Sequence, residues 1–117
     1  MENEITKIYN NDFGIAFQWK HTSSNHGKIQ IVFRNMGFYL TPNEIREFHK
    51  HIFEAQQPKN CSCCNVDCNA RTILLRTPSS KIDLAVNKQE LADVDDLIKG
   101  TLFQLDLNNY LNNICKH

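Results

Sequence analysis

Glycine and proline are scarce in this sequence, and the common motifs that depend on glycine are missing. The 117 residues include 4 glycines and 3 prolines. Neither the G-x-G-x-x-G pattern nor a P-loop occurs, and both use glycine to bring the backbone close to a phosphate. The H-E-x-x-H pattern of zinc proteases does not occur either. These absences exclude the nucleotide-binding proteins and zinc proteases that are defined by these motifs.

An excess of charge of either sign is also missing. Lys and Arg total 13, Asp and Glu total 13, and the formal net charge is zero. Proteins that bind a nucleic acid usually carry a basic face, so no nucleic-acid partner is expected. Hydrophobic residues make up 41% and charged residues 22%, which is ordinary globular usage. One domain over residues 1–117 is therefore expected.

Long hydrophobic runs are missing as well. No apolar run approaches the ~18 residues that a membrane-crossing helix needs. Residues 1–5 have neither the basic nor the apolar region of a secretion signal. We therefore expect no membrane association and a cytoplasmic location, where thiols stay reduced. The odd number of cysteines, 5 in all, also speaks against a disulfide-stapled secreted protein.

The apolar pattern of the first half predicts strands followed by a helix. Strands are expected at residues 5–9, 15–20, 28–34 and 38–40, with turns at 10–14 and 35–37. Thr41 is then a good N-cap, Pro42 suits the first helical position, and Glu44 can reach back to the cap amide. The helix is expected to end near residues 56–58, because a proline disfavours helical geometry in the residue before it.

The second half predicts the same kinds of element in the same order. Strands are expected at residues 71–76 and 81–86. Asn87 then takes the N-cap position and Glu90 the third helical position of a second capping box. Gly100 is the expected C-cap. A separate C-terminal helix is accordingly expected over residues 102–115.

This order predicts an α+β fold. We expect a mostly antiparallel sheet of five to six strands, with two or three helices on one face. Residues 15–57 and 70–100 each give strand, turn, strand and capped helix, so a ββα structural repeat is a candidate. A cysteine-rich linker at 58–69 would join these two half-units.

The same arrangement resembles a known family. The residues that carry the resemblance are the segment Phe33–Glu44, the cysteine-containing linker, and then Arg71, Leu75-Arg76-Thr77, Leu84 and Glu90-Leu91. With these features the chain resembles small uncharacterised bacterial proteins grouped as a domain of unknown function. The resemblance covers most of the chain and rests on fold-type motifs. It implies a fold, and it implies neither an activity nor functional residues.

The linker concentrates the candidate chemistry. Four of the five cysteines fall between positions 61 and 68. Cys61, Cys64 and Cys68 form a C-x2-C-x3-C set. Soft thiolates suit zinc or an iron–sulfur cluster, and zinc is the favoured of the two. A tetrahedral site would need a fourth ligand. The candidates for it are His49, His51, Cys115 and His117.

Two alternatives to zinc stay open for this linker. The cysteines could form a polar loop of free, reduced thiols without a ligand. Alternatively, Cys61 and Cys64 could act as a thiol-redox pair, although such C-x-x-C motifs usually open a helix after a strand, and this one follows a helix.

Acidic residues at 93, 95 and 96 suggest a solvated helix face, with Asp95 able to pair with Lys99.

The function favoured by these observations is a small, non-enzymatic, cytosolic binding or regulatory module with a cysteine-rich, metal-binding linker. Its expected partner is another protein or a second copy of itself. Aromatic residues such as Trp19 and Tyr39, together with strand edges, would suit protein partners. The alternative is a thiol-redox or cysteine-dependent small enzyme that uses Cys61 or Cys64.

Overall fold

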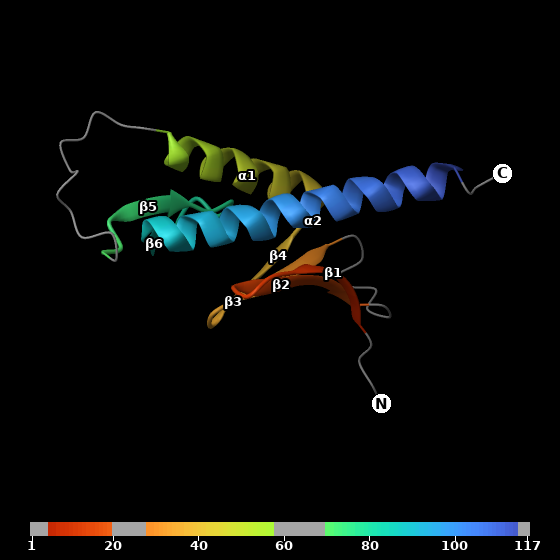
Figure 1. Cartoon of the computed structure of the whole chain (residues 1–117), viewed down its shortest axis with the longest axis horizontal. Coiled ribbons are helices and arrows are strands. Elements are labelled where there is room, and N and C mark those ends of the chain that lie inside the picture. Colours follow the sequence, from red (N-terminus) through yellow and green to blue (C-terminus); the bar gives the residue numbers. More distant parts are fainter. Residues whose placement is uncertain (1–4, 20–27, 58–69, 115–117) are drawn as a thin grey trace.

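The computed structural model describes residues 5–19, 28–57 and 70–114. Its first layer is a four-stranded antiparallel sheet with the strands in sequence order. The strands are β1 (Ile5–Asn10), β2 (Gly14–Trp19), β3 (Ile29–Phe33) and β4 (Met36–Leu40). Both helices lie on the same side of this sheet (Figure 1). The inward-facing residues Ile29, Ile31 and Phe33 of β3 are buried, as their alternation predicts.

The turn between β3 and β4 lies one residue earlier than the sequence predicts. Phe33 pairs with Met36, so the two turn residues are Arg34 and Asn35. Gly37 was predicted in the turn, and it instead lies within β4, opposite Val32. Arg34 has a φ of 54°, in the left-handed region that residues other than glycine seldom adopt. The tight turn therefore requires an unusual backbone conformation from an arginine.

Helix α1 (Pro42–Gln56) begins with the predicted capping box. The Glu44 amide donates to Thr41 Oγ1 at 3.2 Å, and the Thr41 amide donates to Glu44 Oε1 at 2.9 Å. The helix ends at Gln56, as predicted, and its buried face carries Ile45, Phe48 and Ile52. These side chains join the core between α1 and the rest of the fold.

The remaining strands form a sheet of their own. Strands β5 (Ile73–Arg76) and β6 (Asp83–Val86) pair antiparallel as a two-stranded sheet. The prediction of a single five- to six-stranded sheet is therefore wrong, although the described residues contain six strands. One face of the β5–β6 hairpin, with Leu75, Leu84 and Val86, is buried in the core. The hairpin thus covers the helices with its apolar face instead of extending the larger sheet through its edge.

Helix α2 (Lys88–Ile114) begins where the sequence predicts and ends much later. Its cap is present: the Glu90 amide donates to Asn87 Oδ1 at 2.7 Å. Gly100, the predicted C-cap, lies inside the helix, so the predicted separate helix over residues 102–115 is part of α2. A Cβ on Gly100 would lie within 2.6 Å of Tyr9 Cδ2. The close approach of β1 therefore explains why position 100 is a glycine, and a left-handed backbone at a helix end does not.

The helix α2 connects the parts of the fold. It packs along α1 on one side and against β1 and β2 on another, and its first turns contact β6. Its second half extends beyond the ends of α1 and of the sheet (Figure 1). The order strand, strand, helix occurs twice, as β3–β4–α1 and as β5–β6–α2.

Candidate functional site

The most distinctive polar group in the described structure is the Glu90 carboxylate. Glu90 stands in the first turn of α2, and its side chain is 6% exposed. One carboxylate oxygen, Oε1, accepts the Asn87 amide at 3.0 Å, which completes the capping box. The positive end of the helix dipole also stabilises a negative charge at this position. The helix start therefore fixes this carboxylate in place.

Two arginines from distant parts of the sequence bind Glu90. Arg71, two residues before β5, donates from Nε to Oε1 at 3.0 Å and from Nη2 to Oε2 at 2.9 Å. Arg34, in the β3–β4 turn, donates from Nη2 to the same Oε2. The Arg71 hydrogen bonds hold the pKa of Glu90 below its usual range, helped by the Asn87 amide and the Arg34 charge and opposed by burial. Glu90 in turn raises the pKa of Arg71.

Aromatic rings support the Arg34 guanidinium. Its carbon Cζ lies 5.3 Å from the centre of the Phe13 ring, a distance at which a cation is attracted to the ring face. Phe13 stacks on Phe33 with ring centres 5.2 Å apart. Phe13 is itself held by Asn11 Oδ1, which accepts the backbone amides of Phe13 and Gly14 at 2.9 Å. The β1–β2 turn thus helps to position Arg34.

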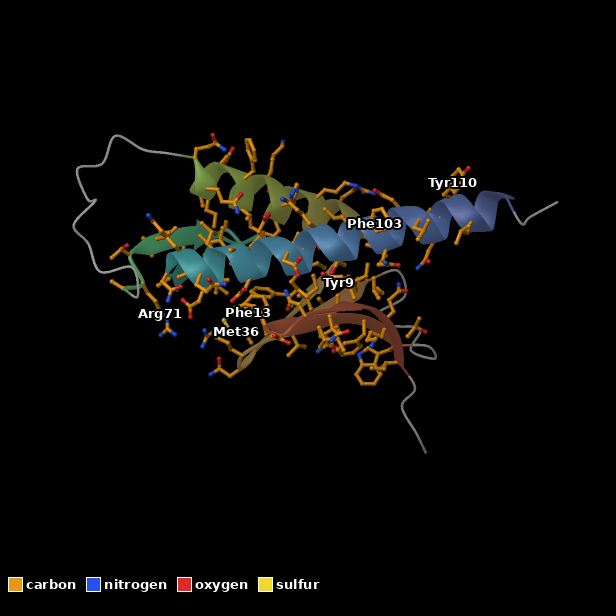
Figure 2. The ribbon with its side chains drawn as sticks, viewed as in Figure 1. Tyr9, Phe13, Met36, Arg71, Phe103 and Tyr110 are labelled. Atoms are coloured by element: carbon orange, nitrogen blue, oxygen red, sulfur yellow. The ribbon has the colours of Figure 1, made fainter. Side chains whose placement is uncertain are left out.

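These groups border a groove of about 570 Å³ between the β3–β4 turn, β6 and the start of α2. Its charged residues are Arg34, Arg71, Glu90 and Asp83. Its apolar lining includes Phe13, Met36 and Ile82. Figure 2 shows Arg71, Phe13 and Met36 gathered beside the first half of α2. The groove therefore combines fixed charges with apolar surface.

The chemistry of the groove suits binding better than proton transfer. A guanidinium stays protonated at every physiological pH. Glu90 has a lowered pKa, and its oxygens already accept hydrogen bonds from Asn87, Arg34 and Arg71. The lowered pKa keeps Glu90 ionised and a guanidinium keeps its protons, so these groups are better suited to holding a ligand than to donating a proton.

Most of the predicted metal ligands lie where the structure gives no description. Cys61, Cys64, Cys68, Cys115 and His117 lie outside the described residues, so the zinc hypothesis stays a prediction. Within residues 5–19, 28–57 and 70–114, no group of three or more His, Cys, Asp or Glu side chains could hold a metal ion.

One of the two candidate histidines of α1, His51, has neighbours that need no metal. His51 Nδ1 lies 3.2 Å from the carbonyl oxygen of Arg76, and its Nε2 lies 3.9 Å from a Glu47 oxygen. His49 is half-buried on the same helix. His51 therefore connects α1 to β5 in the described structure.

Two acidic residues in the middle of α2, Asp95 and Asp96, make structural contacts. Asp95 Oδ2 pairs with Lys99 Nζ at 3.1 Å, which confirms the predicted pair. Asp96 Oδ2 accepts from Tyr9 Oη at 3.0 Å and from Asn11 Nδ2 at 2.9 Å. The Asp96 hydrogen bond raises the pKa of the Tyr9 phenol. These contacts attach α2 to β1 and to the β1–β2 turn.

Comparison with known proteins identifies the family and leaves the activity open. The model of a family of unknown function, DUF6686, matches residues 1–114. The chain belongs to this family. Searches of the curated proteins and of the solved structures found no match. In the described part of this DUF6686 member, no helix is both long enough and apolar enough to cross a membrane.

The sequence alone did not reveal the groove. Glu90 was recognised through its capping-box spacing, which predicts a helix start and says nothing of two arginine partners. Arg34 and Arg71 lie 56 and 19 residues before Glu90, so no local pattern relates them. The sequence carried one signal for the position of Arg34: it stands beside Asn35 between two predicted strands, at a place where a turn was expected.

Proposed function

We propose that this DUF6686 member is a non-enzymatic binding module that holds a carboxylate-bearing ligand in the groove beside Glu90. The observation that supports this most directly is the Arg34–Glu90–Arg71 arrangement, in which one buried carboxylate holds two guanidiniums at the edge of a groove. A preformed site with a few fixed polar groups on apolar walls is typical of ligand pockets.

The hydrogen-bond capacity of the three side chains favours a second carboxylate. Each guanidinium has five N–H donors. Glu90 accepts from the Asn87 amide and from both arginines, which uses its lone pairs. Among residues 5–19, 28–57 and 70–114, Glu90 is the hydrogen-bond acceptor of both guanidiniums, so the donors that it does not take are open to a ligand. The side chains of Arg34 and Arg71 are 52% and 56% exposed. A planar carboxylate matches a guanidinium with two parallel hydrogen bonds.

The rest of the groove restricts the ligand. Phe13, Met36 and Ile82 offer apolar contact, so a ligand with an apolar group beside its carboxylate is favoured. Asp83 also lines the groove, and its negative charge disfavours ligands with several negative charges. The volume of about 570 Å³ lies in the range of small-molecule and peptide-end sites. A peptide end with an apolar last residue meets all of these conditions.

A matched pair of probe peptides tests this proposal. We expect acetyl-Ala-Leu-Phe with a free carboxylate to shift the amide NMR signals of Arg34, Arg71 and Glu90, and its C-terminal amide to shift them much less. The Arg71→Gln variant should bind the acid about tenfold more weakly, because a hydrogen bond to a charged group contributes about 1.5–3 kcal/mol.

Arg76→Gln is the control, since Arg76 is an exposed arginine on β5 that does not line this groove. It should bind the acid like the wild type. Equal binding of the acid and the amide, or no binding of the acid at millimolar concentration, would overturn the proposal.

A further inference from the structure

A second feature, separate from the groove, lies on the part of α2 that extends beyond the sheet. Phe103, Leu107 and Tyr110 follow one another at intervals of four and three residues, and Leu111 lies beside them. This spacing puts them on one helix face. Their exposed fractions are 63% for Phe103, 36% for Leu107, 63% for Tyr110 and 46% for Leu111. We name this set the α2 stripe.

The α2 stripe continues a helix face that the fold covers elsewhere. Gly100 and Asp96, on the same face one and two turns earlier, contact Tyr9 of β1. From residue 106 to residue 111 every side chain of α2 is exposed. Figure 2 shows Phe103 and Tyr110 along the half of α2 that leads away from the sheets. A large apolar patch left open in this way is typical of an interaction site.

The polar residues around the α2 stripe favour a second copy of this chain. Between positions 101 and 114 the only charged residue is Asp106, which lies 3.5 Å from Arg46 of α1. The nearest other polar residues on the helix surface, at about 100° per residue, are Gln104 and Asn108, both beside Leu111. An amide side chain both donates and accepts hydrogen bonds, so a surface of amides is complementary to itself. A twofold interface needs that property, because it places the same patch on both partners.

The same composition disfavours a membrane surface as the occupant. Helices that lie on membranes carry Lys and Arg on their polar face, and residues 101–114 contain neither. A strongly charged protein partner is disfavoured as well, because the one charge beside this face, Asp106, is already paired with Arg46.

We propose that the α2 stripe is a homodimer interface, in which α2 packs antiparallel against α2 of a second copy about a twofold axis near Leu107. The spacing of four and three residues suits helix pairs that cross at about 20°. In this arrangement Leu107 meets Leu107 of the second copy, and Phe103 of each copy meets Leu111 of the other. The groove beside Glu90 lies at the other end of α2 and stays open.

The area of the α2 stripe sets the expected affinity. A fully buried aromatic side chain covers about 150–250 Å², and a leucine covers less. With the exposed fractions given above, the four side chains of the α2 stripe together expose about 400 Å² per copy. With a polar rim, two copies would bury about 1,200 Å², which is the lower limit of specific interfaces. A dissociation constant on the order of 10 μM is therefore expected.

Sedimentation velocity of the full chain tests the interface. We expect monomers at about 1 μM and dimers at about 300 μM. Leu107→Glu and Leu107→Lys should each raise the dissociation constant at least about tenfold, because like charges then meet at the axis of an apolar interface. The control is Phe53→Glu, since Phe53 is an apolar side chain of α1 that is 58% exposed. It should dimerise like the wild type.

A mixture of the two variants separates a lost interface from a damaged fold. Leu107→Glu mixed with Leu107→Lys should form heterodimers at least about tenfold more tightly than either variant forms homodimers, because opposite charges now meet. Circular dichroism should show the same helix content in all variants. A wild type that stays monomeric at about 300 μM, or a mixture no tighter than its components, would overturn the proposal.

Discussion

The ring of Tyr9 packs directly on the backbone of Gly100. A Cβ at Gly100 would lie within 2.6 Å of Tyr9 Cδ2, and the Tyr9 hydroxyl is held by Asp96 at 3.0 Å, one turn earlier in α2. The strand β1 and the middle of α2 therefore meet at a distance that only a residue without a side chain allows.

The first prediction concerns this contact. Gly100→Ala should lower the free energy of unfolding by about 1 kcal/mol, because the Tyr9 ring must leave its position, and this cost exceeds the gain in helix propensity. In a Tyr9→Ala background the same change should raise the free energy of unfolding, since only the propensity gain remains. Urea unfolding of the four proteins as a double-mutant cycle measures the coupling. Additive effects would contradict the close contact.

The second prediction concerns the charge of Glu90. Glu90→Gln keeps a side chain that can complete the capping box, and it removes the charged partner of Arg34 and Arg71. At pH 7 the variant should lose about 1–2 kcal/mol of unfolding free energy. Glu44→Gln is the control, because Glu44 has the same capping position in α1 and its described partner is its own cap, Thr41. The control should change by a few tenths of a kcal/mol.

The pH dependence of the Glu90 contribution follows from the direction of its pKa shift. The folded protein lowers the pKa of Glu90 below its ordinary value of 4.5, first through the Arg71 hydrogen bonds. The unfolded chain then binds the proton more tightly, so protonation favours unfolding. The contribution should be complete above about pH 5 and should disappear as the pH falls through the folded pKa. Urea midpoints of the wild type and Glu90→Gln should converge in acid, and a constant difference would contradict this.

The third prediction concerns the backbone of Arg34. Arg34→Ala and Arg34→Gly both remove the guanidinium from Glu90 and Phe13, and they differ in how well they accept a φ of 54°. The glycine variant should be more stable than the alanine variant by about 1 kcal/mol, because alanine is strained in the left-handed region. Thermal unfolding compares the two. Equal stabilities would mean that the turn relaxes to another conformation.

The fourth prediction concerns the cysteine segment. Elemental analysis with native mass spectrometry, on protein purified without a His-tag, is expected to find about one zinc ion per chain. Cys64→Ser should then lose the metal and thermal stability together. Rapid alkylation of Cys61 or Cys64 at neutral pH, with the fold intact after substitution, would instead support the thiol-redox alternative. A metal-free, fully reduced protein would contradict the zinc hypothesis.

The helix starts could be predicted from the sequence because their signals are local. Thr41 and Glu44 stand three residues apart, as do Asn87 and Glu90. In each pair the side chain of the cap residue accepts the amide of the glutamate, and the glutamate side chain accepts the amide of the cap residue. The family resemblance was predicted from the same fold-type motifs, and the match over residues 1–114 confirms it.

Features that depend on distant residues could not be predicted in this way. The end of α2 was misplaced because glycine commonly ends helices, and the role of Gly100 depends on Tyr9, 91 positions away. The number of sheets was wrong because strand patterns define a buried face and do not say which edges pair. For the same reason, neither the groove nor the partners of Glu90 could be inferred before the fold was known.

The attachment of β1 to α2 also constrains the order of folding. Tyr9 and Asp96 are separated by 87 positions, and closing a loop of that length costs about 4 kcal/mol of chain entropy. During synthesis, β1 can pair with β2 early, but it cannot reach α2 until most of the chain has left the ribosome. Chains that stop before position 96 lack the contact entirely. We therefore expect the docking of β1 onto α2 to be a late step, and long-range contacts of this kind to slow folding.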